Sequence, residues 1–359
     1  MNKNRSDRPR MRDIASQAGV SLGTVSRVLN GKTDVAPSLA KRVMKAVKES
    51  GYEPRASLRA PQPHQDRLGP IGILMDDIAY SSRTTTPFQA NLIHGIEQRS
   101  RELGGHMVLS NCQEDAKTGS LPSMIQEGIV QSAIIRVNRS IPDSWINRIA
   151  EQIPTVLLMH RDHKHTIPSI YCDNHGSITQ IFNHLSRLNH RRIGFYSEDE
   201  GKNTNPIHIE RQFYFERLLS DFGFSTDPEL VQVPQKRRGE NYKDLIDRTC
   251  KKFLQMGKDR PTAIVCAADT YALHLQTALR QQGLSLPRDM SVIGFMNTED
   301  CNLASPPLTS ISLNEEELGR TAVDLLHRRM QNPNAIVRHI LVATDLIIRE
   351  SCAPPNSQT

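Results

Sequence analysis

Short polar side chains and one arginine recur between residues 21 and 30. They are Ser21, Thr24, Ser26, Arg27 and Asn30. Hydroxyl and amide groups at the start of a helix, together with the free backbone N–H groups there, suit contacts to phosphate oxygens. A guanidinium can instead pair with O6 and N7 of guanine, and a phosphate contact is the alternative for Arg27. The pattern indicates a segment that binds a polyanion such as DNA.

The two residues between Ser21 and Thr24 carry no hydrogen-bonding group. Leu22 can only pack against an apolar surface such as the methyl group of thymine. Gly23 makes no side-chain contact, but it would let a helix approach the floor of a groove closely. We therefore expect direct readout by Arg27 and an apolar preference from Leu22, with DNA shape supplying further specificity.

No constellation typical of an enzyme stands out in the chain. There is no P-loop and no GxGxxG, and no Ser/His/Asp or paired-carboxylate arrangement is evident. The run HRDHKH, residues 160–165, lacks carboxylates or cysteines at the spacing of zinc ligands. The six cysteines are scattered, as expected for reduced thiols. We expect a protein that is not an enzyme and that has neither cofactor nor metal.

Helical spacing of apolar residues predicts three short helices before residue 52. Gly19 ends the first helix, Ser21 is suited to cap the second, and Pro37 opens the third. The apolar stripes are Met11, Ile14, Ala15 and Ala18; Val25, Val28 and Leu29; and Ala40, Val43, Met44 and Val47. Two helices joined by a tight glycine turn indicate a helix-turn-helix, with the second helix entering the groove of DNA.

The net charge of +6 is concentrated at one end of the chain. Residues 1–60 hold 13 Lys and Arg against 5 Asp and Glu, whereas the remainder holds 32 against 34. A basic segment on a near-neutral body favours a polyanionic partner, because neutralised phosphates release their counterions. No apolar run approaches the ~18 residues that span a bilayer, and no signal peptide is evident, so we expect a cytoplasmic protein without membrane contact.

After a proline-rich linker at residues 61–70, apolar runs alternate with amphipathic helices. The runs begin at residues 71, 106, 132 and 155, and again at 192, 230, 263 and 291. Predicted helices lie near 88–103, 120–129 and 143–151 in the first series, and near 176–188, 207–222, 241–256 and 270–282 in the second. This alternation predicts two lobes with parallel sheets, and a ligand pocket at the strand ends between them.

The order of these parts resembles the LacI/GalR (lactose-repressor) family of bacterial transcription regulators. The resemblance is dense in MRDIASQAGVSLGTVSRVLNG and in VAPSLAKRVMKAVKESGYEP, and it covers nearly the whole chain. Weaker similarities to the family follow in the same order along the chain, among them HLSRLNHRRIGFY, GLSLPRDMSVIGF and PPLTSISLNEEELGRTAVDLL. The resemblance implies an all-α helix-turn-helix headpiece and an α/β two-lobed core like that of periplasmic binding proteins.

The resemblance also implies boundaries and partners. We expect a headpiece with its hinge at 1–60 and a core at 71–359, with lobe 1 at about 71–172 and 311–336 and lobe 2 at about 173–310 and 337–359. We further expect a homodimer on a palindromic operator in double-stranded DNA. A small effector, a sugar or related metabolite, would bind in the inter-lobe cleft and shift DNA affinity.

The hinge departs from the family pattern at Pro61. Arg59 stands where the family has an arginine, but Pro61 stands where a leucine usually wedges into the minor groove. Proline ends a helix and disfavours helical geometry at the residue before it. Whether a hinge helix forms is therefore open, and Leu58 could serve as the wedge.

Candidate effector residues follow the ends of predicted strands. The resemblance implies that Arg211 reaches the effector, with a salt bridge as the alternative. Asp269 matches an aspartate near the family's pocket, but it could equally cap the following helix. Phe88 could stack on a ligand or pack in the core. Met296 and Asn297 stand where the family usually has an aspartate after GF, which argues against an ordinary pyranose.

We interpret the chain as a sequence-specific, dimeric DNA-binding transcription regulator and expect a repressor. One alternative is a regulator whose degenerate pocket no longer responds to an effector. Another is a small-molecule-binding protein on the same two-lobed core with an incidental headpiece. The sequence identifies neither the operator, nor the effector, nor the sign of the effector's action.

Overall fold

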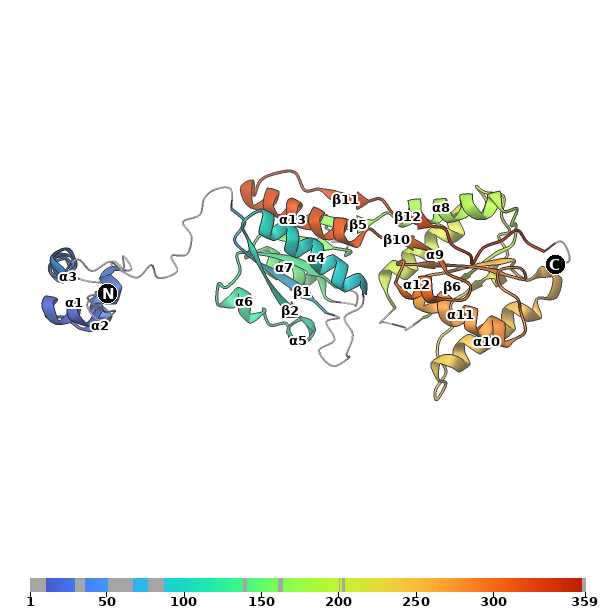
Figure 1. The fold of residues 1–359 in the computed structure, drawn as a ribbon, viewed down its shortest axis with the longest axis horizontal. Helices are drawn as coiled ribbons and strands as arrows, with labels where there is room; N and C mark the ends of the chain where they lie inside the picture. Colours follow the sequence, from blue (N-terminus) through green and yellow to red (C-terminus); the bar gives the residue numbers. More distant parts are fainter. Residues whose placement is uncertain are drawn as a thin grey trace, which may run out of the picture. The chain divides into compact units, whose positions relative to one another are not determined.

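The computed structural model describes residues 11–29, 36–50, 67–76, 87–137, 141–160, 164–199, 201 and 204–356. The chain divides into two compact units, Met1–His64 and Gln65–Thr359 (Figure 1). Leu68 is buried, and its backbone N–H donates to the carbonyl of Leu103 at 3.0 Å. The larger unit therefore begins inside the segment expected as a linker, because an apolar side chain there finds a place in the core.

The described residues of the smaller unit form three helices, as the apolar spacing predicts. They are α1 (Met11–Ala18), α2 (Leu22–Leu29) and α3 (Pro37–Ser50). Ile14, Val25 and Val43 are fully buried in one core. The prediction for Met44 is wrong: this side chain is 55% exposed, and Ala46 takes the inner position on α3.

The first lobe of the larger unit is built on a six-stranded parallel sheet of order β11-β5-β4-β3-β1-β2. Its strands are β1 (Pro70–Met75), β2 (His106–Asn111), β3 (Ser132–Arg136), β4 (Thr155–Leu158), β5 (Ser169–Cys172) and β11 (His339–Val342). Successive side chains of a strand point to opposite faces, so Ile73 and Leu74 enter different clusters.

Helices cover both faces of this sheet. The pair α4 (Pro87–Glu102) and α13 (Glu315–Gln331) lies over one face, side by side (Figure 1). The other face is covered by α5 (Gln113–Thr118), α6 (Ser123–Gln126) and α7 (Asp143–Ala150). A Cβ on Gly95 would lie 2.2 Å from the carbonyl oxygen of Glu316, so glycine is needed where α4 meets α13.

The second lobe has the sheet order β12-β10-β9-β8-β6-β7, in which only β12 is antiparallel to its neighbour. Its strands are β6 (Ile193–Tyr196), β7 (Val231–Gln232), β8 (Ala263–Cys266), β9 (Ser291–Phe295), β10 (Thr309–Ser312) and β12 (Asp345–Ile347). Its helices are α8 (Asn174–Arg187), α9 (Pro206–Leu218), α10 (Tyr242–Gln255), α11 (Asp269–Gln281) and α12 (Asp300–Leu303).

The chain crosses between lobes three times, after β5, β10 and β11. The expected return to lobe 2 at residue 337 is too early, because β11 pairs with β5 in lobe 1. Half of the β11 residues are exposed, so the segment lacks the continuous apolar run that marks a buried strand. The crossing segments lie together, since the N–H of Asp173 donates to Val342 at 3.0 Å and Asn314 Nδ2 donates to Ala343 at 2.9 Å.

The single helix predicted near 120–129 is also wrong. Two short helices, α5 and α6, occupy residues 113–126 instead. Gly119 is left-handed with φ of 72° and ends α5, and Pro122 precedes α6. Both residues break helical geometry, so the apolar spacing around them is not carried by one helix. No helix within the described ranges is both long and apolar enough for a bilayer.

Candidate functional site

The start of α2 is fixed by a cap from the residue before it. Ser21 Oγ accepts a hydrogen bond from the backbone N–H of Thr24 at 3.1 Å, and the two hydroxyl oxygens lie 2.9 Å apart. This bond satisfies one of the free N–H groups of the first turn. Both hydroxyl groups are exposed, so they remain accessible to a ligand at the N-terminus of α2.

Leu22 and Gly23 present an open surface at the same turn. The side chain of Leu22 is 45% exposed although it is apolar. A Cβ added at Gly23 would meet only Ser21 Oγ, at an ordinary distance of 3.7 Å. The described part of the small unit therefore leaves room for a larger side chain at position 23.

The other candidate DNA contacts are not tested by the structure. Ser26 and Arg27 lie on α2, but the described residues do not include their side chains. Asn30, Leu58 and Arg59 lie outside the described residues. Their roles, and the formation of a hinge helix before Pro61, stay predictions.

The turn between α1 and α2 depends on an arginine that sequence reasoning missed. Gly19 has a left-handed φ of 60°, and Arg42 Nη2 from α3 donates to the carbonyl of Ala18 at 2.6 Å. A cation at the C-terminus of α1 also complements the helix dipole. Arg42 therefore helps to set the angle at which α2 leaves the turn, and no local pattern in the sequence signals this contact.

In the larger unit, the Asp269 side chain connects the segment after β9 with β10 by hydrogen bonds. Its carboxylate accepts from Ser310 Oγ at 2.6 Å and from the N–H of Thr298 at 2.8 Å. The prediction that it caps α11 is wrong, because the N-cap is Ala268 and Asp269 is the first helical residue. The side chain is 1% exposed, and burial raises its pKa. A Cβ on Gly294 would lie 2.2 Å from its Oδ1, so glycine is needed there.

The backbone after β9 is left-handed at two consecutive residues. Met296 has φ of 106° and Asn297 has φ of 48°. Such conformations cost about 1–3 kcal/mol and cluster at functional sites. Asn297 Oδ1 accepts from Arg349 Nη2 at 2.7 Å, and the same arginine donates to Asn302 Oδ1 at 2.8 Å. The amide oxygen expected to meet an effector is thus already bonded within lobe 2.

Arg211 is the most deeply buried cation of the candidate site. It is 2% exposed, with Nε donating to Asn174 Oδ1 at 3.1 Å and Nη1 to the carbonyl of Ala267 at 2.7 Å. The guanidinium carbon lies 4.2 Å from the centre of the Phe295 ring. Burial lowers its pKa, yet a guanidinium remains charged at neutral pH. Both bonded acceptors are neutral, which differs from the salt bridge considered as the alternative.

Phe88 lies in the core rather than in open space. It is 4% exposed, and the guanidinium carbon of Arg136 lies 5.1 Å from the centre of its ring. Arg136 ends β3 and is itself 5% exposed. A buried cation over an aromatic face is a favourable contact. Core packing, one of the two roles considered for Phe88, is the role seen.

A polar aromatic group at the strand ends of lobe 2 was missed. Tyr196 Oη donates to Glu198 Oε1 at 3.0 Å, and the Tyr196 and Tyr271 rings lie 5.8 Å apart. His208 on α9 lies 5.5 Å from the Tyr271 ring, and its pKa is lowered to about 3 by burial and by Arg211. These residues follow a predicted strand or open a predicted helix, and that position was the available signal.

In the histidine run at 160–165, the structure describes His160, Lys164 and His165, and residues 161–163 lie outside the described residues. His160 Nε2 lies 3.7 Å from Asp143 Oδ1, and the His165 ring packs edge-on against His339. No three His, Cys, Asp or Glu side chains in the described ranges gather at metal-ligand geometry.

Comparison with known proteins matches both units to known families. A model described as bacterial regulatory proteins, lacI family, matches residues 10–55, and a periplasmic binding protein-like domain matches residues 182–352. The transcriptional repressor MelR of Bacillus subtilis (strain 168) is 29% identical, covering 96% of this chain and 97% of that protein. The repressor CytR of Escherichia coli (strain K12) is 28% identical, with 95% of each chain covered.

Solved structures share the fold. A complex of the transcriptional regulator CelR with cellobiose has a TM-score of 0.65 at 24% identity, covering 96% of this chain and all of that one. The lac repressor dimer bound to operator and the anti-inducer ONPF has a TM-score of 0.63 at 22% identity, covering 96% and 99%. At these identities the likeness concerns the fold.

Proposed function

The chain belongs to the lacI family of bacterial regulatory proteins, and from this premise we propose that it is a sequence-specific, DNA-binding transcriptional repressor. It acts as a homodimer on a palindromic operator in the cytoplasm, and a small effector in the cleft of the core modulates it. The relatives named above are regulators rather than enzymes, and we assign no reaction to this chain.

The observation that carries this proposal is the open first turn of α2. Capped hydroxyl groups, an exposed Leu22 and a glycine without an internal role lie together there. In a groove of DNA, Ser21 and Thr24 would bond phosphate oxygens and so fix the register. Leu22 would pack on a thymine methyl group, while Gly23 would allow close approach.

Arg27, one turn further along α2, is proposed to read guanine. Ser26 and Asn30 would add phosphate contacts, and Leu58 and Arg59 would act in the minor groove. Residues 1–60 would thus form the DNA-binding part, while the larger unit forms dimer and effector sites. A guanidinium–guanine pair contributes roughly 1–3 kcal/mol of discrimination.

Operator selection with the purified full chain tests the proposal. Arg27→Ala is expected to relax preference at a guanine position, whereas Arg12→Ala, which removes the same charge from an exposed site on α1, should weaken all duplexes about equally. A chain that enriches no duplex, at any salt concentration, would contradict the repressor function. An unchanged site preference in Arg27→Ala would contradict the assigned readout alone.

A second candidate is a repressor that responds to no effector. It is favoured by Asp269 and Asn297, whose side chains are already bonded within lobe 2. Measuring operator affinity over a panel of metabolites separates the two candidates. A compound that changes the affinity excludes the second.

A further inference from the structure

The loop between β7 and α10 carries three consecutive cations. Lys236, Arg237 and Arg238 are all exposed, and they follow the carboxyl end of β7 in lobe 2. Ligands of parallel sheets bind at the carboxyl ends of the strands. These cations therefore lie at the edge of the sheet where the effector is proposed to bind.

The backbone of this loop is held by the segments beside it. Gln235 pairs with Asp199, which follows β6, and its Nε2 donates to Asp199 Oδ2 at 2.5 Å. Arg248 on α10 donates to the carbonyl of Gln235 at 3.0 Å, and the N–H of Arg237 donates to Glu240 Oε2 at 2.8 Å. The fold thus fixes the backbone on both sides of the cations.

The carboxylates beside the loop are bonded to other groups. Glu240 accepts from Arg248 Nε at 2.9 Å and from its Nη2 at 3.0 Å, and these bonds lower the pKa of Glu240 to about 2. Asp199 accepts from Gln235. Within the described ranges, no hydrogen bond or ion pair joins a side chain of residues 236–238 to another residue.

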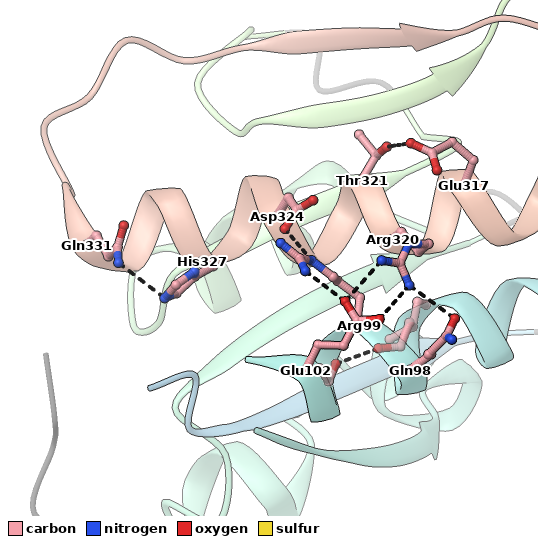
Figure 2. A network of polar contacts seen from close by, with 11 residues as sticks. Gln98, Arg99, Glu102, Glu317, Arg320, Thr321, Asp324, His327 and Gln331 are labelled. Atoms are coloured by element: carbon pink, nitrogen blue, oxygen red, sulfur yellow. Dashed lines mark hydrogen bonds and ion pairs between the residues drawn. The ribbon is translucent and has the colours of Figure 1, made fainter. Parts of the chain in front are cut away.

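The partly exposed arginines of lobe 1 are paired in a way that the loop cations are not. Arg320 on α13 donates to both carboxylate oxygens of Glu102 on α4 at 3.0 Å, and Figure 2 shows its guanidinium turned toward α4. Arg99 donates to Glu102 and to Asp324, each at 2.7 Å. Those arginines join two helices, whereas the side chains of residues 236–238 remain open to a ligand.

A buried cation at the same edge is bonded to neutral groups. Arg211 donates to Asn174 Oδ1 at 3.1 Å and to the carbonyl of Ala267 at 2.7 Å. Ala267 follows β8, which is separated from β7 by β6, so the ends of β8 and β7 lie about 10 Å apart, at two strand spacings. The segment after β9 begins with Met296 and Asn297, which bring no negative charge to this edge.

Two further carboxyl groups at this edge are buried and bonded within the lobe. Glu198 is 7% exposed and accepts from Tyr196 Oη at 3.0 Å. Asp269 is 1% exposed and accepts from Ser310 Oγ at 2.6 Å. Burial shields these acidic groups, whereas the cations of residues 236–238 are exposed, so the charge that a ligand meets here is positive.

We propose that the effector carries a phosphoryl group, which binds Lys236, Arg237 and Arg238 while the rest of the molecule extends along the strand ends toward Arg211. A phosphoryl group has a charge of about −1.5 to −2 at neutral pH and offers three acceptor oxygens. Guanidinium groups bond such oxygens in pairs, and an ammonium group adds a compact charge. The inference rests on the proposed function, since it names the chemical class of the effector.

The test is binding of matched phosphorylated and unphosphorylated sugars to the full chain. The pairs are D-glucose 6-phosphate with D-glucose, D-ribose 5-phosphate with D-ribose, and D-fructose 1,6-bisphosphate with D-fructose, and D-gluconate supplies a carboxylate. At about 10 mM and constant ionic strength, a dissociation constant of about 1 mM appears as a higher melting temperature. At least one phosphorylated sugar is expected to raise it while its unphosphorylated partner does not, and titration calorimetry then gives the affinity.

Removal of the loop charges is expected to weaken that binding. A variant with Lys236→Gln, Arg237→Gln and Arg238→Gln should bind the phosphorylated sugar about tenfold more weakly or worse. It should melt at the parent's temperature without ligand, because the exposed side chains that it replaces have no bonded partner in the described part of the chain.

A matched control removes the same charge from the other edge of the sheet, where the strands of lobe 2 begin. It carries Arg187→Gln, Arg217→Gln and Lys258→Gln, at exposed positions near the C-terminal ends of α8, α9 and α10. This control should bind the phosphorylated sugar as the parent does. Equal losses in the two variants would show a general effect of net charge and would overturn the proposal.

Other results would also overturn it. These are no shift from any phosphorylated sugar, shifts of equal size from the unphosphorylated partners, or unchanged affinity in the loop variant. Binding of D-gluconate as tight as that of every phosphorylated sugar would contradict the phosphoryl group as the recognised chemistry. Binding to the basic residues 1–60 is distinguished as well, since both variants leave them unchanged.

Operator binding measured on the same samples separates this inference from the proposed function. A chain that binds a selected duplex but no phosphorylated sugar contradicts the phosphoryl site alone. A chain whose loop binds a phosphorylated sugar but which binds no duplex contradicts the repressor function while the phosphoryl site stands.

Discussion

The polar side chains at the first turn of α2 and those at the strand ends of lobe 2 differ in how they are bonded within the protein. At α2, the Ser21 hydroxyl group bonds within its own helical turn, to Thr24, and Leu22 and Gly23 face open space. In lobe 2, Asp269 and Asn297 are bonded to segments distant in the sequence. The first turn of α2 leaves its groups open to a partner, whereas the polar groups at the strand ends of lobe 2 already have hydrogen-bond partners within the protein.

This difference bears on how each region can be changed. A residue that meets only a partner can be altered without loss of folding, and the effect then appears in binding. A residue bonded on all sides affects stability first, because its loss strands buried donors and acceptors.

The largest effect is expected from Asp269→Ala. Removing the carboxylate leaves the buried Ser310 Oγ and the half-buried N–H of Thr298 without their acceptor, and should cost about 4 kcal/mol of the free energy of unfolding. Urea unfolding of the full chain, monitored by far-UV circular dichroism, measures the loss. Asp221→Ala, at an exposed position, is the control. A loss below about 1 kcal/mol would show that Asp269 does not hold the strand ends and would break the comparison.

The next effect is a pH dependence confined to the larger unit. His190 is fully buried, with Nδ1 2.8 Å from Thr262 Oγ1 and Nε2 3.0 Å from the carbonyl of Ala353. Burial lowers its pKa to about 4. The unfolded chain, with a histidine pKa of about 6.5, binds the proton first, so stability present above pH 6.5 is lost as the pH falls to 4. The loss is expected to be about 3 kcal/mol.

Unfolding by urea at a series of pH values measures this slope. His190→Gln should be less stable at pH 7 and should show a shallower decline between pH 6.5 and 4. The decline is not abolished, because the pKa of His208 is also depressed, to about 3. The same slope in the parent and in His190→Gln would exclude His190 as its source.

A smaller effect is expected at Arg42, which forms a hydrogen bond within the small unit. Arg42→Ala removes the bond to the carbonyl of Ala18, and because the side chain is exposed the cost should be about 1–2 kcal/mol. Hydrogen exchange of the α1 and α2 amides in the full chain measures it. Lys41→Ala, which removes a neighbouring exposed charge, should leave exchange unchanged. If the α1 and α2 amides exchange at equal rates in the two variants, the Arg42 side chain does not stabilise the small unit.

These cases also explain which features were predictable from the sequence. The three helices of the small unit follow from local signals, namely the apolar spacing around Ile14 and Val25 and the turn at Gly19. The alternation of strands and helices gives two lobes, but edge strand β11 shows alternating exposure and was missed. Its omission put the last lobe boundary in the wrong place.

The roles of single polar residues were harder to predict than the fold. The family resemblance selects Asp269 and Asn297, but their bonding depends on Ser310 and Arg349, which only tertiary structure brings near. Likewise, three consecutive glutamates begin α13, and no sequence rule tells which one is buried. In these cases the sequence predicted where a residue lies along its helix or strand, but not which residue from a distant part of the chain it bonds to.

The smallest effect on stability, and the sharpest test of the comparison, is expected from Gly23→Ala. Alanine favours a helix over glycine by about 1 kcal/mol, and the added Cβ would meet only Ser21 Oγ at 3.7 Å. The small unit should therefore exchange its α2 amides more slowly. Operator affinity should nevertheless fall about tenfold, or about 1.4 kcal/mol, if the methyl group separates α2 from the groove floor.

Fluorescence anisotropy with a selected duplex at fixed salt measures the affinity of Gly23→Ala. Leu22→Ala on the same turn is the companion variant, and it should lose discrimination between thymine and other bases while helix stability changes little, since Leu22 is 45% exposed. A gain in both stability and affinity in Gly23→Ala would mean that the glycine serves neither the fold nor the complex. A gain in stability with a loss of affinity would place the requirement for glycine in the DNA complex, because the free protein leaves that space empty.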